Sequence, residues 1–139
     1  MADYSVKRID DMEAAYWGSF KRVRAELGLS SFGVQILDLP PNSEAYPEHD
    51  HSEDGQEELY VALRGGGEIE IAGKRHPFGP DTLASVPSGT KRKVLPGDEG
   101  IRLLIVGGKP GEPYEVPVSP AVSELGAPDP SEGRDPPQG

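Results

Sequence analysis

The chain has no cysteine, only three histidines and no apolar run of the length that a membrane-spanning helix requires. Without cysteine there are no disulfides and no thiolate ligands, so a bound metal has to be held by nitrogen and oxygen. Positive charge is also scarce. The 14 lysines and arginines face 24 aspartates and glutamates, which gives a net charge of -10 at pH 7. Phosphates would repel such a chain, which argues against nucleic acid or an anionic membrane as its partner.

The length and the changes of composition predict one domain with two different flanks. The 139 residues suffice for one domain with a substantial core and not comfortably for two. We expect a helical segment over residues 1–30, a β-domain over 31–107 and an extended, disordered tail over 108–139, where glycine and proline are frequent and apolar residues few. Within the tail, Tyr114, Val116 and Val118 can dock as one extended piece. The first residues lack a secretion signal, so we expect a cytoplasmic protein.

Apolar residues recur at intervals of three and four between residues 10 and 28, which predicts a helix. They are Met12, Tyr16, Phe20, Val23 and Leu27. Asp10 or Asp11 would cap the start of this helix and Gly28 its end. Gly18 weakens the pattern and favours a split into two pieces. The segment is expected to cover one face of the domain.

From Ser31 onward, short apolar runs are separated by turn signals at nearly regular intervals, which predicts an all-β sandwich or barrel. The predicted strands are residues 32–39, 58–63, 68–71, 75–78, 82–86, 91–95 and 101–106. We interpret the second and third as a hairpin that turns on Gly65–Gly67. Ala72–Lys74 is predicted to be a further turn.

The residues most informative about function are His49, His51 and Glu58. Alternate residues of an extended chain point to the same face, so His49 and His51 can reach one metal ion. Glu58 begins an apolar strand and can add an oxygen ligand. Two imidazoles and a carboxylate are a recurrent ligand set for divalent transition metals. The competing interpretation is a group of exposed polar residues in an acidic loop that contains Glu48, Asp50, Glu53 and Asp54.

The strand that begins at Glu58 has two possible registers, and the sequence leaves both open. Glu57 and Glu58 point to opposite faces, so only one of them enters the barrel. With Glu58 inward, Tyr60 and Ala62 also line the cavity. With Glu57 inward, the cavity receives the three large aliphatic residues Leu59, Val61 and Leu63.

Residues 43–65 resemble the first sequence motif of the cupin superfamily. That motif runs glycine, five residues, His-x-His, three or four residues, glutamate, six residues, glycine. His49, His51, Glu58 and Gly65 match it, whereas Ser43 stands at the first glycine and six residues separate His51 from Glu58. The resemblance extends over roughly residues 31–107.

The second cupin motif is only half present. It runs glycine, five residues, Pro-x-Gly, two residues, histidine, three residues, asparagine. Pro87–Gly89 fits, Gly79 lies two residues too far upstream, and the asparagine position holds Pro96. The histidine position, which usually supplies the fourth metal ligand, holds Arg92.

The resemblance implies a double-stranded β-helix, or jelly-roll barrel, often a homodimer, with a metal in the barrel mouth. By this analogy His49, His51 and Glu58 are the ligands of a divalent transition metal such as iron, manganese, nickel or zinc. Cupins include dioxygenases, isomerases, epimerases, decarboxylases, sugar-binding and storage proteins, so the fold alone does not decide the activity.

Arg92 cannot ligate a metal, because its guanidinium stays protonated. If it points into the barrel, it binds a carboxylate or phosphate of a ligand. If it points outward, residues 91–93 form a solvated, charged edge strand. Tyr60 is a candidate ligand-binding residue or proton donor beside the site, with core packing as the alternative. His76 is a weaker candidate for a replacement nitrogen ligand.

Three functional hypotheses follow. The first is an oxygenase or isomerase that uses the open coordination positions of the metal on a small polar or anionic molecule. The second is a non-catalytic binding or sensor module that holds a small acid through Arg92. The third is a scaffold with a degenerate site.

Overall fold

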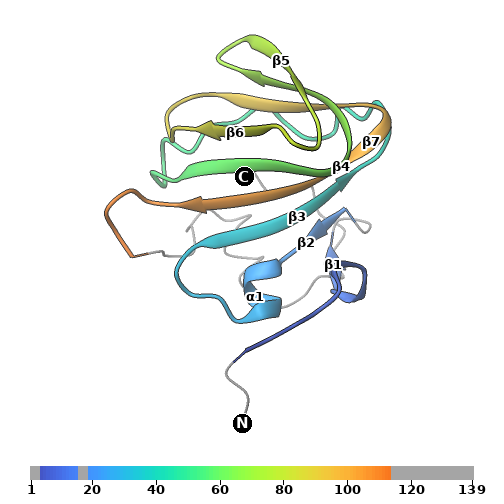
Figure 1. The fold of residues 1–139 in the computed structure, drawn as a ribbon. Coiled ribbons are helices and arrows are strands. Elements are labelled where there is room, and N and C mark those ends of the chain that lie inside the picture. The colour runs from blue at the N-terminus through green and yellow to red at the C-terminus, as the bar shows by residue number, and fades with distance from the viewer. Residues whose placement is uncertain (1–3, 16–18, 114–139) are drawn as a thin grey trace.

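The computed structural model describes residues 4–15 and 19–113, which form antiparallel β-structure with very little helix. Two long strands dominate, β4 (Glu57–Ile71) and β7 (Arg92–Gly108). They pair from Glu57 opposite Gly108 to Ile71 opposite Arg92 (Figure 1). The strand order is β1-β2-β3-β7-β4-β5, and β6 pairs with β4. The shorter strands are β1 (Ala14–Ala15), β2 (Phe20–Lys21), β3 (Gly33–Leu39), β5 (Lys74–Phe78) and β6 (Leu83–Val86). The all-β prediction is confirmed.

The helix predicted over residues 10–28 is wrong for most of its length, whether continuous or split at Gly18, although a short helix does end at Gly28, the predicted cap. The segment forms a 3-10 turn at Ile9–Asp11, strands β1 and β2, and one five-residue helix, α1 (Val23–Leu27). Phe20 lies opposite Leu37, so β2 extends the sheet through β3 (Figure 1). Three of the periodic apolar residues, Met12, Phe20 and Val23, are indeed buried, but burial alone does not distinguish a helix from short strands. Tyr16 and Gly18 lie outside the described residues.

The hairpin predicted at Gly65–Gly67 is also wrong, because β4 continues through the three glycines as one bent strand. Its pairing with β7 shifts register between Ala62 and Arg64 and again between Gly65 and Gly67. Gly65 has a φ of 73°, and a side chain there would collide with the backbone of Gly100. A side chain at Gly67 would collide with the backbone of Leu95. The glycines therefore allow two long strands to bend together at close approach.

The register question in β4 is settled by burial. Glu58, Tyr60 and Ala62 are buried, whereas Leu59 and Leu63 are 36% and 41% exposed. Glu58 therefore faces the barrel interior, and Glu57 is exposed. Among the described residues, fourteen buried hydrophobic residues form the interior core, and they are drawn mainly from β3, β4 and β7. The turn predicted at residues 72–74 is confirmed, since β4 and β5 form a hairpin with Ile71 opposite Lys74.

A buried arginine, Arg102, connects the N-terminal segment to the barrel through ion pairs. Arg102 on β7 donates hydrogen bonds to Asp38 on β3 at 2.6 and 3.0 Å, and to Asp10 at 2.6 Å. Only 8% of Arg102 is exposed. These ion pairs connect residues far apart in the sequence, and no sequence pattern indicated them.

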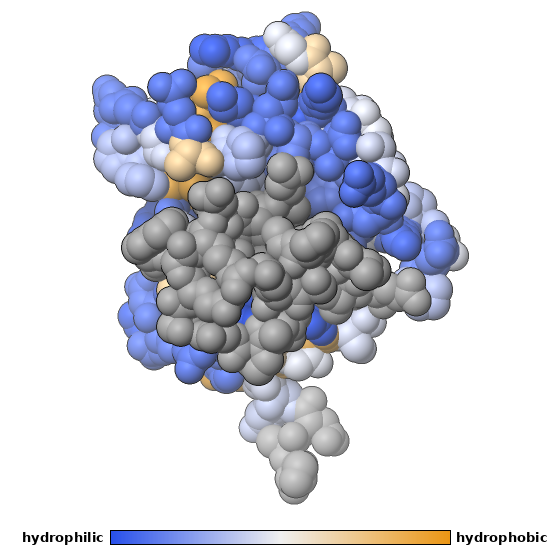
Figure 2. Space-filling model, turned by 180° about the vertical axis from the view of Figure 1, so that it is seen from behind, coloured by the Kyte–Doolittle hydropathy of each residue, from blue (hydrophilic) through white to orange (hydrophobic). Residues whose placement is uncertain are grey.

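In the described part of the chain, no helix combines the length and the apolarity needed to cross a membrane. The described residues on the face shown in Figure 2 are mainly hydrophilic, with small apolar areas. The tail prediction for Tyr114, Val116 and Val118 lies outside the described residues.

Candidate metal centre

The two histidines are held by backbone hydrogen bonds rather than by a regular strand. The backbone N–H of His49 donates to the carbonyl of Arg92 at 3.0 Å, and that of Arg92 donates back to His49 at 2.9 Å. The backbone N–H of His51 donates to the carbonyl of Ser88 at 2.7 Å. The segment therefore runs beside residues 88–92, and the alternation of side chains aims both imidazoles into the barrel, as the sequence predicts.

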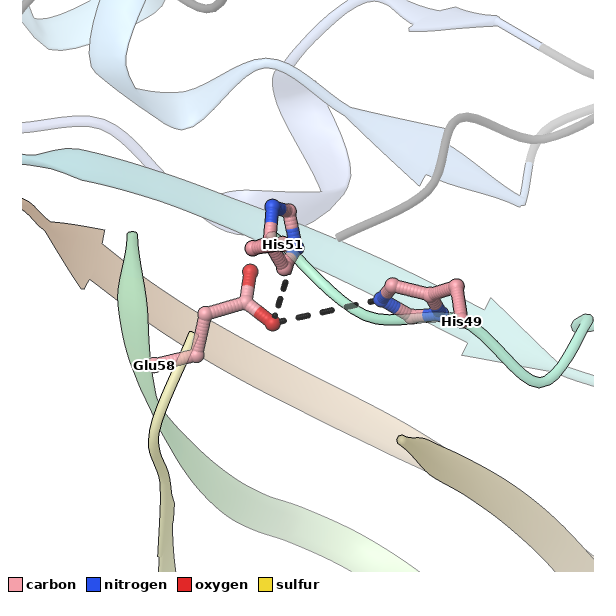
Figure 3. Close-up of side chains that lie close together, drawn as sticks. All are labelled: His49, His51 and Glu58. Atoms are coloured by element: carbon pink, nitrogen blue, oxygen red, sulfur yellow. Dashed lines mark ion pairs between the residues drawn. The ribbon is translucent and has the colours of Figure 1, made fainter. Parts of the chain in front are cut away.

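His49, His51 and Glu58 come together inside the barrel (Figure 3). One donor atom from each lies within 4.8 Å of the others, and all three residues are buried. The Oε1 atom of Glu58 is 3.3 Å from Nε2 of His51 and 4.0 Å from Nε2 of His49. The alternative of three exposed residues in an acidic loop is therefore wrong.

His49 presents an unprotonated Nε2 to the interior. Its Nδ1 lies 3.1 Å from the carbonyl oxygen of Pro47, and since a carbonyl only accepts, Nδ1 carries the proton. Burial lowers the pKa of His49, and this outweighs the opposing effects of the Pro47 carbonyl and Glu58. Its Nε2 is buried and has no hydrogen-bond partner among the described residues. A neutral imidazole with a free inward nitrogen is ready to ligate a metal.

His51 is oriented by a carboxylate that the sequence analysis did not single out. Its Nδ1 donates to both oxygens of Asp54, at 3.1 and 3.0 Å. Burial on its own would lower the pKa of His51, but Glu58 and Asp54 outweigh it and raise the pKa. A carboxylate behind a histidine is the usual outer support of a metal ligand. Asp54 lies in the loop that is longer than the family pattern, so the extra residues supply this support.

Glu58 accepts a hydrogen bond from the hydroxyl of Tyr60 at 2.7 Å, on the same Oε1 atom that faces the histidines. Burial would raise the pKa of Glu58, yet His51, Tyr60 and Arg92 together lower it, so the carboxylate is ionised. The pKa of Tyr60 is raised well above its usual value, chiefly by burial, so its hydroxyl stays a donor. Tyr60 therefore orients Glu58 from within the barrel.

Arg92 points into the barrel and is fully buried, so the solvated-edge interpretation is wrong for this residue. Its Nη2 donates to the carbonyls of Val86 and Pro87 at 3.2 and 2.9 Å. Its Nη1 lies 3.8 Å from Oε1 of Glu58, too far for a hydrogen bond. Nε and Nη1 are buried and have no hydrogen-bond partner in the described part of the chain. Lys91, by contrast, is exposed.

Gln56 is another buried hydrogen-bond donor besides Arg92, and the sequence analysis did not identify it. It precedes β4 by one residue and is 4% exposed, and its Nε2 finds no hydrogen-bond partner among the described residues. Its Oε1 would lie 3.0 Å from a Cβ added at Gly107, and Cγ of Glu58 would lie 3.4 Å from the same Cβ. Gly107 thus leaves room for the side chains of Gln56 and Glu58. Nothing in the spacing of the motif marks a glutamine at this position.

A pocket of about 380 Å³ lies at the ends of the strands near Glu58, and Leu59, Ser85 and Val106 line it from the outer face of the sheet. Its lining is largely apolar and comes mainly from the ends of β4, β6 and β7. The lining residues are Phe32, Glu57, Glu58, Leu59, Ser85, Val86, Pro87, Val106, Gly107 and Gly108. Glu58 belongs to both the pocket and the histidine cluster. This volume suits a small organic molecule.

His76, the remaining candidate ligand, lies away from the site, whereas Tyr46 lies beside it. His76 on β5 is exposed and lies opposite Ile69 of β4, so it does not join the cluster. The ring of Tyr46 is buried and meets His49 edge to face, with 5.4 Å between the ring centres. Tyr46 therefore packs against a candidate ligand.

The residues present fit a divalent transition metal on their own chemistry. Two buried imidazole nitrogens lack hydrogen-bond partners among the described residues and face an ionised carboxylate. Each imidazole is held in the required tautomer by an outer acceptor. Nitrogen and carboxylate oxygen donors suit zinc, iron, manganese and nickel.

Comparison with known proteins decides the family. The model of the cupin domain matches residues 35–107, more than half of the chain. The chain belongs to the cupin family. This cupin has the first-motif residues in place and an arginine where the second motif has its histidine. A comparison with curated proteins found no match.

Solved structures confirm the cupin jelly roll. A cupin protein from Bacteroides fragilis is 22% identical with a TM-score of 0.66, over 86% of this chain and 97% of the other. A protein from Photorhabdus luminescens is 18% identical with a TM-score of 0.60, over 77% and 88%. KdgF from Halomonas sp. is 12% identical with a TM-score of 0.51, over 56% and 68%. At these identities the likeness concerns the fold.

Proposed function

We propose that this cupin binds one divalent transition metal through His49, His51 and Glu58, and that a small polar or anionic molecule completes the site. One observation carries the proposal: the buried Nε2 atoms of both histidines lie beside one ionised carboxylate, without other partners among the described residues. Three protein ligands leave coordination positions open. A metal in this place supplies Lewis-acid or oxygen chemistry.

The residues around the ligands hold the site in one arrangement. Pro47 and Asp54 fix the tautomers of His49 and His51, which leaves Nε2 of each ring unprotonated and able to ligate the metal. Tyr60 holds the Glu58 carboxylate by a hydrogen bond. Arg92 places a permanent positive charge beside Glu58 and offers Nε and Nη1, which have no hydrogen-bond partner in the part of the chain that the structure describes, to an anionic molecule.

Metal content tests the proposal. The purified protein is loaded with iron, manganese, nickel or zinc, desalted, and measured by mass spectrometry beside the His49→Ala/His51→Ala double variant. We expect close to one metal per chain in the wild type and loss in the variant. A protein that holds no metal after loading, while folded, would exclude the proposal.

Two activities remain candidates for the metal-bound protein. The ligand set resembles that of non-haem iron oxygenases, so an oxygenase or isomerase acting on a small molecule is the first hypothesis. Arg92 at the histidine position favours the second, a non-catalytic binding or sensor cupin. Ligand binding that persists after chelation of the metal would support the second. The homodimer and the cytoplasmic location stay predictions.

A further inference from the structure

We infer that Gln56 is a second recognition residue of the site, which donates a hydrogen bond to a neutral oxygen of the bound molecule. The molecule is then a small keto, ether or hydroxy acid, with its carboxylate at Arg92 and the neutral oxygen at Gln56. The inference rests on the proposed function for the metal and for the charged end of the molecule, and it adds the other end.

Gln56 lies on the interior face of the barrel beside Glu58. Glu58 of β4 is directly opposite Gly107 of β7, so a Cβ at Gly107 would project to the same face as the Glu58 side chain. That Cβ would lie 3.0 Å from Oε1 of Gln56 and 3.4 Å from Cγ of Glu58. The amide of Gln56 therefore occupies the interior space over Gly107, next to a candidate metal ligand.

The amide of Gln56 has a hydrogen-bond donor that the fold leaves unused. Only 4% of Gln56 is exposed, and its Nε2 has no hydrogen-bond partner within residues 4–15 and 19–113. Buried polar atoms of side chains nearly always have a partner. An acceptor on a bound molecule supplies the partner that Nε2 lacks. The amide is uncharged, so it suits a neutral oxygen, whereas the guanidinium of Arg92 suits a carboxylate.

Gln56 and Arg92 flank Glu58 on opposite sides. Strand β4 lies between β6 and β7 here, so Glu58 has Val86 opposite it on one side and Gly107 on the other. The guanidinium of Arg92 donates to the carbonyl of Val86, and the amide of Gln56 lies over Gly107. The two donors thus approach the site from different strands. A molecule that satisfies both needs a second acceptor at some distance from its carboxylate.

The loop that supports His51 also positions Gln56. Asp54 accepts from Nδ1 of His51 at 3.1 and 3.0 Å, and its Oδ1 also accepts from the backbone N–H of Gln56 at 3.0 Å. One carboxylate therefore holds a candidate ligand and the backbone from which the Gln56 side chain extends. This shared support keeps Gln56 in a fixed position relative to the metal site, as the positioning of a bound molecule requires.

Calorimetric titration of small acids into the zinc-loaded protein tests the inference. Levulinate is compared with pentanoate, and methoxyacetate with butyrate, because the acids of each pair have chains of equal length and differ by one oxygen acceptor. Keto and ether oxygens only accept, so they match the N–H of Gln56. In at least one pair we expect the acid with the extra oxygen to bind about three- to tenfold more tightly, the usual effect of one neutral hydrogen bond.

Two variants locate the effect. Gln56→Met removes the donor and keeps the length of the side chain, so the gain from the extra oxygen should fall to less than about twofold. The zinc content should stay that of the wild type, since Gln56 is not a ligand. Glu57→Met is the matched control, because it introduces the same side chain one residue along, at an exposed position on the opposite face. This variant should keep the gain.

The outcomes separate this inference from the proposed function. A folded protein that takes up no zinc overturns both. Zinc uptake without binding of any acid, or with equal affinities within both pairs, overturns the inference alone. A gain that survives in Gln56→Met does the same, because the neutral oxygen then contacts another group.

A crystal structure of the zinc-loaded wild type with levulinate decides the matter if Gln56→Met does not fold. We expect the keto oxygen within about 3.2 Å of Nε2 of Gln56. A keto oxygen bound away from Gln56 overturns the inference.

Discussion

Arg92 and His49 lie directly opposite each other, joined by a reciprocal pair of backbone hydrogen bonds of 3.0 and 2.9 Å. Directly opposed residues of an antiparallel pair project to the same face. The side chain at position 92 therefore faces the same interior as the imidazole of His49. In the family, the residue at this position usually supplies a fourth metal ligand. Here the same position puts the positive charge of Arg92 beside the three candidate ligands.

Replacing Arg92 with histidine should rebuild a four-ligand site. The change removes a buried cation and adds an imidazole on the same backbone. We expect zinc affinity to rise at least about tenfold, which corresponds to 1.4 kcal/mol. Calorimetry measures the affinity of both proteins. Unchanged or weaker affinity in a folded variant would show that position 92 does not reach the metal.

Asp54→Asn should weaken metal binding by about 10- to 100-fold, the usual effect of losing the support behind a ligating histidine. The carboxylate that accepts from Nδ1 of His51 is replaced by an amide of the same shape. The matched control is Asp50→Asn, because Asp50 is in the same loop but bonds only Ser52 among the described hydrogen bonds. Equal losses in the two variants would indicate a general effect of loop charge, contrary to this account.

Gly107→Ala should disturb the site through packing. The added methyl would lie 3.0 Å from Oε1 of Gln56 and 3.4 Å from Cγ of Glu58. We expect zinc affinity to fall by roughly tenfold and stability to fall by about 1–3 kcal/mol. Gly108→Ala is the control, since nothing lies within 4 Å of its added carbon. Zinc titration and urea unfolding of both variants check this, and identical behaviour would argue against it.

Asp10→Asn should destabilise the fold at neutral pH but not in acid. The hydrogen bond and charge of Arg102 lower the pKa of Asp10 below 3.8. The pKa of Asp10 is lower in the folded protein than in the unfolded protein. The ion pair therefore stabilises the folded protein at pH values above the unfolded pKa, and this stabilisation is lost as the pH falls through the folded pKa. Asp10 is exposed, so the effect is small.

Urea midpoints at pH 7 and in acid measure the contribution of Asp10. Asp11→Asn serves as control, because within residues 4–15 and 19–113 the side chain of Asp11 has only a 3.8 Å contact with Arg8 and both side chains are exposed. A difference between Asp10→Asn and wild type that does not shrink as the pH is lowered below 3.8, the ordinary pKa of an aspartate, would contradict the assignment.

The cluster of candidate ligands was predictable because it depends on local geometry. The alternation of His49 and His51 and the apolar strand after Glu58 are visible in a few consecutive residues. The direction of Arg92 and the choice between Glu57 and Glu58 depended on which face of a strand was buried. That is a property of the whole barrel, so the sequence left both open.

The errors share one physical cause, which is long-range pairing. Phe20 has helical spacing with its neighbours, but its partner is Leu37 on β3. Gly65 suggests a turn, but β7 bends at the same place and keeps the strand continuous. Asp54 and Gln56 gave no signal, because one is among several acidic residues of the loop and the other belongs to no motif.

The most direct test is a crystal structure with equimolar zinc and an anomalous difference map at the zinc edge. The account predicts one strong peak per chain, at about 2.0–2.2 Å from Nε2 of His49, Nε2 of His51 and a carboxylate oxygen of Glu58. A peak bound elsewhere, or no peak at these residues with zinc present in the crystal, would contradict it.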